Sequence, residues 1–168
     1  YNLLMDRGVE AEDILLKTNT AGMDLLPSNI DLSAAEVQLV GEVAREQTLG
    51  RGLATIADDY DYVLIDCQPS LGLLTVNALT AAHGVIIPLE CEFFALRGVA
   101  LLMDTISKVT ERLNPELELD GILATMYDTR TTHGREVLAR VVEALDDRVF
   151  HTVIARTVRF PETTVAGE

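Results

Sequence analysis

A short apolar run that ends in an acid constrains the fold of this chain more than any other feature. Residues 62–65 are Tyr-Val-Leu-Ile, and Asp66 and a turn-forming segment over 67–72 follow directly. Four consecutive apolar residues are typical of a strand with both faces covered, as in a parallel sheet flanked by helices. We therefore expect a strand over 61–66, with Asp66 at its carboxyl end, where ligands bind in open α/β folds.

Strand and helix patterns alternate along the chain. Two short helical or mixed pieces, separated by Gly8, are expected over 1–18. Further strands are expected over 23–27, 85–89, 119–126 and 149–154. Helices are expected over 32–40 (with Asp31 or Ser33 as N-cap), 42–57, 73–79, 96–113 and 134–145. Such alternation implies right-handed crossovers and the α/β class, a mainly parallel sheet with helices on both faces.

Composition limits the classes of function. The 168 residues are about enough for one domain, and 48% of them are hydrophobic. No apolar run approaches the roughly 18 residues of a membrane span, and no signal segment opens the chain, so we expect a cytoplasmic protein. A net charge of −14 argues against indiscriminate binding to nucleic acid or anionic membranes.

Positive charge is nevertheless concentrated near the end of the chain. Segment 130–159 contains six arginines and four acidic residues, a net charge of +2, whereas the rest of the chain carries −16. One interpretation is a solvated helix face with charge pairs. The other is a surface that neutralises phosphates.

The Asp66 motif also has two interpretations. Four apolar residues followed by Asp is the Walker B pattern, in which the carboxylate holds water or hydroxyl groups on Mg²⁺ beside the β- and γ-phosphates. An Asp also ends many parallel strands merely because it caps the next helix or turn. The motif alone leaves both interpretations open.

Several longer motifs occur in a fixed order. They are DLLPSNIDL (24–32), YVLIDCQPSLG (62–72), TVNAL (75–79), VIIP (85–88), EFFALRG (92–98), GILATMYDTRT (121–131) and VF with VIARTVR (149–159). In these motifs and their order, nearly the whole chain resembles the ParA/Soj partition ATPases, of the deviant-Walker group that also includes MinD.

This resemblance implies a P-loop NTPase-like fold and ATP and Mg²⁺ as cofactors. It implies a cytoplasmic, nucleoid-associated ATPase whose ATP-dependent homodimer binds DNA without sequence preference. Hydrolysis would be stimulated by a centromere-binding ParB-type partner, and no membrane partner is expected. Asp66 would be the Walker B carboxylate, with a catalytic role and a water-mediated bond to Mg²⁺.

The resemblance also implies roles for two later segments. Thr125 and Met126 match the segment that approaches the adenine in this family, and Ala155 and Arg156 match a loop on the other side of the base. Arg156 and Arg159 match a basic loop implicated in DNA contact, which favours the phosphate-binding interpretation of the basic segment.

The chain departs from the family pattern at three places. Gln68 stands where the family has Pro or another small residue, and Ala155 stands where the family has Pro. No GxxxxGK[ST] occurs, because Lys17 follows Leu and Lys108 follows Ser. The family's first strand, P-loop, lysine and catalytic Asp would lie before Tyr1.

We therefore expect residues 1–168 to be a partial ParA-type nucleotide-binding domain, a single domain truncated at both ends. Such a piece should expose apolar surface and should not hydrolyse ATP alone. Two alternatives are a MinD-like cell-positioning ATPase, which would need a C-terminal amphipathic membrane helix, and a degenerate binding module without turnover.

Overall fold

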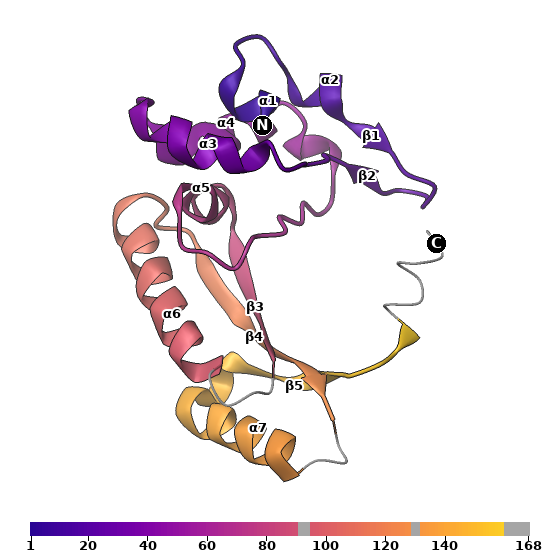
Figure 1. Cartoon of the computed structure of the whole chain (residues 1–168), viewed down its shortest axis with the longest axis vertical. Helices are drawn as coiled ribbons and strands as arrows, with labels where there is room; N and C mark the ends of the chain where they lie inside the picture. Colours follow the sequence, from indigo (N-terminus) through magenta and orange to yellow (C-terminus); the bar gives the residue numbers. More distant parts are fainter. Residues whose placement is uncertain (91–94, 129–131, 160–168) are drawn as a thin grey trace. The chain divides into compact units, whose positions relative to one another are not determined.

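The computed structural model describes residues 1–90, 95–128 and 132–159 (Figure 1). The chain divides into two compact units. The first comprises residues 1–83 and 106–117, and the second comprises residues 84–105 and 118–168. The long helix α6 (Ala95–Arg112) contributes residues to both units.

The first unit is mainly helical. Its helices are α1 (Asn2–Met5), α2 (Ala11–Ile14), α3 (Leu32–Gln38), α4 (Thr48–Leu53) and α5 (Leu73–Ala81). Its strands β1 (Leu16–Lys17) and β2 (Asp24–Leu25) form an antiparallel hairpin. A small core is centred on Ala11, Leu53 and Ile56, so the first half of the chain buries its own apolar cluster.

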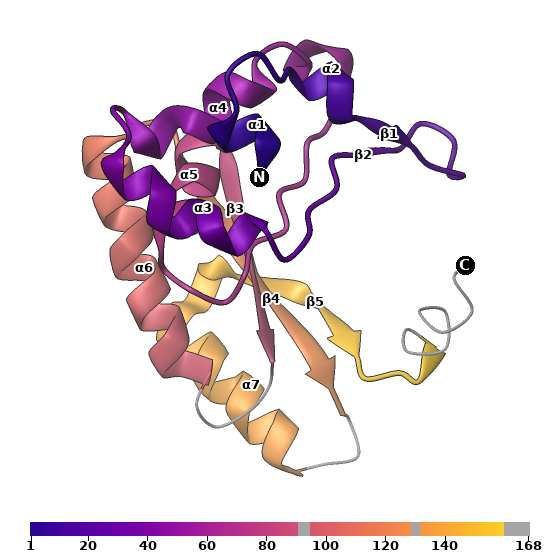
Figure 2. The same ribbon diagram turned by 45° about the horizontal axis from the view of Figure 1, so that its top comes forward.

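The second unit contains a parallel sheet in the order β3-β4-β5. The strands are β3 (Gly84–Glu90), β4 (Glu118–Tyr127) and β5 (Val149–Ala155), and α7 (Thr132–Leu145) connects the last two (Figure 2). Ile122 in β4 and Val141 in α7 are almost completely buried. The prediction of an α/β fold with a parallel sheet and flanking helices is confirmed.

Most element predictions agree with the structure. The strands expected over 85–89, 119–126 and 149–154 and the helices expected over 73–79, 96–113 and 134–145 are present within a few residues of those bounds. The two short helices before residue 18 are also present. The strand expected over 23–27 is present only as the two residues of β2, Asp24–Leu25. The prediction of a single domain stays a prediction.

Two helix predictions need correction. The helix expected over 42–57 is broken into a 3₁₀ turn at Arg45–Gln47, α4, and a 3₁₀ turn at Ala57–Asp59. Ala44 has a left-handed backbone (φ 52°), which a continuous helix does not allow. Asp31 occupies the expected N-cap position of α3, but its backbone there is helical (φ −64°, ψ −23°) and its side chain makes no capping bond; its carboxylate accepts a bond from Nδ2 of Asn29 (3.0 Å).

The expected strand over 61–66 is wrong, and with it the βαβ unit that it would begin. Residues 62–68 have no regular secondary structure, and Tyr62 and Leu64 are 87% and 92% exposed. A strand exists only when a neighbour accepts and donates its ladder bonds. Within the described ranges, no strand pairs with this segment.

Candidate functional site

Asp66 lies at the end of the unpaired apolar run, and its side chain is exposed. The next residue, Cys67, points its thiol toward the carbonyl oxygen of Ile65 (3.6 Å). Partial burial, and then the negative charge of Asp66, raise the pKa of the Cys67 thiol. The raised pKa favours the neutral thiol of Cys67.

The loop after Asp66 is held by hydrogen bonds at its far end. The Ser70 N–H donates to the carbonyl of Gln68 (2.8 Å), and the Thr75 hydroxyl donates to the carbonyl of Ser70 (2.6 Å). The Glu36 carboxylate accepts bonds from the backbone N–H groups of Leu73 and Leu74. The loop thus has a defined path from Gln68 to α5.

Asn77 in α5 is a buried polar group whose hydrogen bonds are made. Only 1% of its surface is exposed. Its Oδ1 accepts a bond from the N–H of Leu49 (3.0 Å), and its Nδ2 donates to the carbonyls of Arg45 (2.8 Å) and Leu73 (2.9 Å). Asn77 therefore ties α5 to α4 and to the 3₁₀ turn that precedes α4.

Sequence reasoning missed the roles of Glu36 and Asn77. Asn77 lies inside the TVNAL motif, where an Asn in an apolar helix was a usable signal of a buried polar contact. Glu36 gave no such signal, because its partners lie 37 and 38 residues further along the chain.

In the second unit, the ends of β4 and β5 bring four of the predicted site residues together. Tyr127 pairs with Ala155, and the Arg156 N–H donates to the carbonyl of Tyr127 (3.0 Å). Thr125 and Met126 immediately precede Tyr127. Met126 has a left-handed backbone (φ 52°), which is strained for a bulky residue and clusters at functional sites.

The basic residues of this unit are at the surface. Arg156 and Arg159 are exposed, and the Arg159 N–H donates to Oγ1 of Thr157 (3.2 Å). The other described arginines of the segment 130–159 are also exposed; they are Arg135, Arg140 and Arg148. Arg130 lies outside the described residues. The geometry leaves these guanidinium groups accessible to phosphates.

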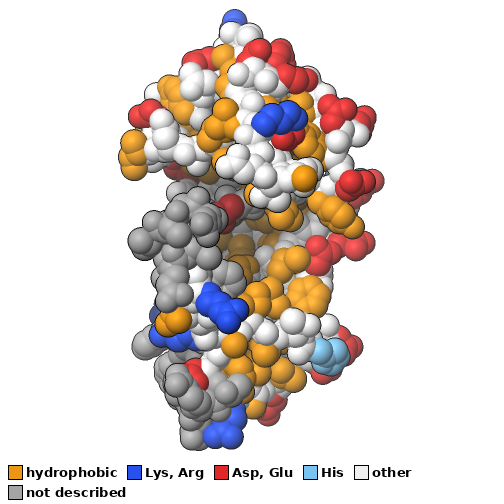
Figure 3. Space-filling model, turned by 90° about the vertical axis from the view of Figure 1, so that its right-hand side faces the viewer, with side chains coloured by type: hydrophobic (Ala, Val, Ile, Leu, Met, Phe, Trp, Pro, Cys, Tyr) orange, Lys and Arg blue, Asp and Glu red, His pale blue; other side chains and the backbone are white. Residues whose placement is uncertain are grey.

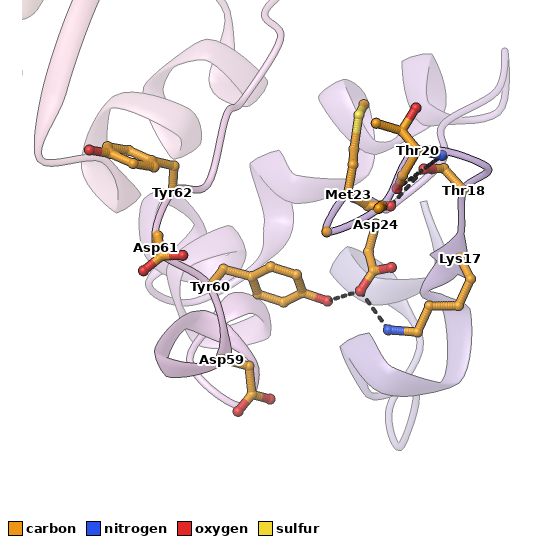
Figure 4. Close-up of a pocket in the computed structure, with 11 residues that line it drawn as sticks. Lys17, Thr18, Thr20, Met23, Asp24, Asp59, Tyr60, Asp61 and Tyr62 are labelled. Carbon is orange, nitrogen blue, oxygen red and sulfur yellow. Dashed lines mark hydrogen bonds and ion pairs between the residues drawn. The ribbon is translucent and has the colours of Figure 1, made fainter.

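A cavity of about 590 Å³ lies between the β1-β2 hairpin and residues 59–62 (Figure 4). On its hairpin side, Lys17 and Asp24 form an ion pair (2.6 Å), and the Tyr60 hydroxyl donates to the same Asp24 oxygen (2.5 Å). Lys17, and then Tyr60, lower the pKa of Asp24, and Asp24 raises the pKa of Tyr60 to about 12. The lining of this cavity contains none of the predicted site residues.

A single exposed carboxylate fits a water-mediated magnesium site. Mg²⁺ keeps several of its waters and takes only one or two protein carboxylates when phosphates supply the other ligands. In the part of the chain that the structure describes, no three His, Cys, Asp or Glu side chains are grouped as a metal site. Asp66 thus fits as a carboxylate that holds a metal-bound water, in a site whose other ligands are supplied by phosphates and water.

Apolar surface is exposed, as expected. Large hydrophobic side chains reach solvent in the first unit at Val43 and Leu64, and in the second unit at Ile86 and Val158. Hydrophobic side chains are also abundant on the face shown in Figure 3. Across the described ranges, every helix is too short or too polar to cross a membrane.

Comparisons with known proteins agree with these observations. A family model described as an AAA domain matches residues 1–119. An uncharacterized protein of Mycobacterium tuberculosis (strain H37Rv) is 65% identical over 168 residues, which are 100% of this chain and 53% of that protein. The chromosome-partitioning ATPase Soj of Treponema pallidum (strain Nichols) is 45% identical over 167 residues, 99% of this chain and 66% of that protein.

Solved structures give the same fold. Cobyrinic acid a,c-diamide synthase from Mycobacterium smegmatis, with bound ADP and magnesium, has 50% sequence identity to this chain and a TM-score of 0.84. The match covers 92% of this chain and 62% of that chain. The chain thus spans about half of the Mycobacterium tuberculosis relative and less than two thirds of the Mycobacterium smegmatis protein.

Proposed function

Because this chain belongs to the ParA/Soj family of partition ATPases and has their P-loop NTPase fold, we propose that it supplies one part of an ATP site that drives chromosome or plasmid partitioning. The observation that carries this proposal is Asp66, an exposed carboxylate at the start of a hydrogen-bonded loop, within motifs that match the family in order. ATP and Mg²⁺ are the proposed cofactors.

Asp66 would accept hydrogen bonds from water molecules on the magnesium ion. Its side chain is exposed, so a hydrated metal ion can reach the carboxylate. Bound magnesium would offset the negative charge of the β- and γ-phosphates. The loop from Gln68 to α5 would hold the backbone next to Asp66 in one path, so the carboxylate meets its ligand without reorganisation.

Thr125, Met126, Ala155 and Arg156 would border the adenine. The support for this assignment is their common position at the ends of two adjacent parallel strands, joined by the bond from Arg156 to Tyr127. Ligands of open α/β folds bind outside the carboxyl ends of the strands. The left-handed backbone of Met126 is a second feature that favours a functional role.

Arg156 and Arg159 would bind DNA phosphates without reading the base sequence. Their exposure supports this role, as does the local excess of positive charge in a chain that is otherwise acidic. The protein would act as an ATP-dependent homodimer in the cytoplasm, on the nucleoid, with a ParB-type partner that stimulates hydrolysis. No membrane partner is proposed.

The test of the ATPase proposal is turnover by the complete protein. Asp66→Ala should lower ATP turnover by about a hundredfold or more, because the charge that orders the metal's waters is lost. Asp61→Ala, which removes an exposed acid five residues earlier, should leave turnover unchanged. The 168-residue piece alone, which contains no GxxxxGK[ST], should show no turnover. Robust hydrolysis by that piece would contradict the proposal.

The test of DNA binding is the salt dependence of a mobility shift with ATP. Arg156→Ala and Arg159→Ala should each weaken binding on every sequence and reduce the slope of log affinity against log salt by about 0.9. Arg7→Ala, at an exposed position of the first unit, is the matched control. Unchanged affinity in both variants would remove these arginines from the DNA surface.

The alternatives predict other outcomes. A MinD-like protein would bind anionic vesicles with ATP and ignore DNA, and a degenerate module would bind its partner without turnover. Turnover that DNA and a partner stimulate distinguishes a partition ATPase from both.

A further inference from the structure

Helix α5 begins without a side-chain cap of its own. Its N-cap residue is Gly72, and no side chain within the helix start satisfies the first N–H groups. Four N–H groups at the start of any helix lack partners inside the helix. The start of α5 therefore needs an acceptor from elsewhere in the chain.

Glu36 supplies that acceptor from α3. Its Oε1 accepts the Leu73 N–H and its Oε2 accepts the Leu74 N–H, so both carboxylate oxygens are used. A negative charge at this point also interacts favourably with the helix dipole. Ala35, just before Glu36, and Leu39, three residues after it, are fully buried, and α3 contacts α5 (Figure 2).

Gly72 makes this contact possible. A β-carbon added to Gly72 would overlap Oε1 of Glu36. Its φ of −86° is accessible to any residue, so the requirement for Gly is one of space and not of backbone conformation. Glu36, Gly72 and the N–H groups of Leu73 and Leu74 form one contact, which we call the Glu36 clasp.

The Glu36 clasp fixes the end of the loop that begins at Asp66. Only five residues separate Asp66 from Gly72, and the Thr75 hydroxyl also donates to the Ser70 carbonyl near the far end of that loop. We propose that Glu36 is a positioning residue for Asp66: by anchoring the start of α5, it sets where the loop places the Asp66 carboxylate. This inference rests on the proposed ATPase function, and Glu36 would act through the backbone of α5, to which its two carboxylate oxygens are bonded.

The decisive measurement is the magnesium dependence of ATP turnover by the complete protein. Glu36→Ala should raise the Mg²⁺ concentration for half-maximal turnover by about tenfold, as for residues that orient a metal ligand indirectly. Glu36→Gln keeps the size and one good acceptor and should give a smaller increase. A purely structural role would lower Tm or the active fraction but leave the half-maximal Mg²⁺ concentration of the remaining active molecules unchanged.

A double-mutant cycle tests whether Glu36 acts through the clasp. Gly72→Ala should raise the half-maximal Mg²⁺ concentration like Glu36→Ala, because the new methyl group displaces the carboxylate. In a Glu36→Ala background, Gly72→Ala should add less than about a twofold change, since the contact is already gone. Glu42→Gln removes the same charge at an exposed position and should change nothing.

The outcomes separate this inference from the proposed function. A wild-type protein without ATP turnover would overturn the proposed function and this inference with it. An active wild type with unchanged Mg²⁺ dependence in both Glu36→Ala and Gly72→Ala would overturn the role of Glu36 alone. If Glu36→Ala fails to fold, Gly72→Ala and Glu36→Gln decide by the same readout.

Discussion

Two apolar runs in this chain have similar sequences and different structures. Residues 85–89 (Val-Ile-Ile-Pro-Leu) lie in β3, which pairs with β4, and Ile87 is only 4% exposed. Residues 62–65 (Tyr-Val-Leu-Ile) have no regular secondary structure and no paired strand, and Leu64 is 92% exposed. The difference shows that an apolar run makes a segment suitable for burial, whereas a neighbouring strand decides whether it becomes a strand.

The largest expected difference between the two runs is in core packing. Ile87→Ala should lower the free energy of unfolding by about 2–5 kcal/mol, because a buried side chain is removed and a cavity remains. Ile86→Ala, on the adjacent 53% exposed side chain, should cost much less. Urea unfolding measures both. Equal losses would mean that β3 does not have one buried and one exposed face.

The unpaired run over 62–65 is followed by a loop that ends in α5. Asn77 holds α5 in place through three hydrogen bonds. Asn77→Ala should lower the free energy of unfolding by about 1–3 kcal/mol, because the Leu49 N–H and the carbonyls of Arg45 and Leu73 lose a buried partner. Asn2→Ala, at an exposed position, is the control. Similar losses for the two variants in thermal unfolding would contradict this role of Asn77.

The hydrogen bond from Tyr60 to Asp24 lies at the upstream end of this run. Its loss should lower the free energy of unfolding by a smaller amount, and only at alkaline pH. Asp24 raises the pKa of Tyr60 from 10.0 to about 12, so the folded protein keeps a proton that the unfolded chain releases. This contribution is complete below pH 10 and is lost as pH rises toward 12. Tyr60→Phe should remove that pH-dependent loss.

Unfolding measured as a function of pH checks the prediction for Tyr60. Tyr62→Phe, at a side chain that is 87% exposed, is the control and should keep the loss between pH 10 and 12. A stability profile that is the same in wild type and Tyr60→Phe would show that the Tyr60–Asp24 bond is absent in solution.

The smallest effect is expected within the unpaired run itself. Leu64→Ser should change the free energy of unfolding of this chain by less than about 0.5 kcal/mol, because the side chain is already in water. Urea unfolding of the 168-residue chain is the measurement. A loss as large as that of Ile87→Ala would mean that residues 62–65 are buried, and the contrast between the two runs would fail.

The reliability of the element predictions depends on whether the deciding interactions are local. Patterns in α6 and α7 place apolar residues on one helix face, α5 is apolar over most of its length, and all three helices are present. The strand over 61–66 and the continuous helix over 42–57 are wrong, the first for lack of a paired neighbour and the second because Ala44 turns left-handed. Neither cause is visible in the pattern of apolar residues.

The candidate site likewise combines residues that the motifs identified with contacts that only the folded chain makes. The motifs located Asp66 and the arginines Arg156 and Arg159, and the parallel register then brought Tyr127 next to Ala155. The residues that hold the Asp66 loop were not predicted. Glu36 meets the start of α5 across 37 residues of chain, and Asn77 meets Leu49 across 28.

The amino-acid sequence by itself determined the class of fold, the family and the chemical type of each site residue, because these depend on residue identity and on spacing along the chain. The tertiary structure alone decided which apolar run is a strand, which carboxylate anchors α5 and which side chains reach solvent. Strand pairing, helix capping from a distant residue and burial all require partners that are remote in sequence, and chain folding is what brings those partners together.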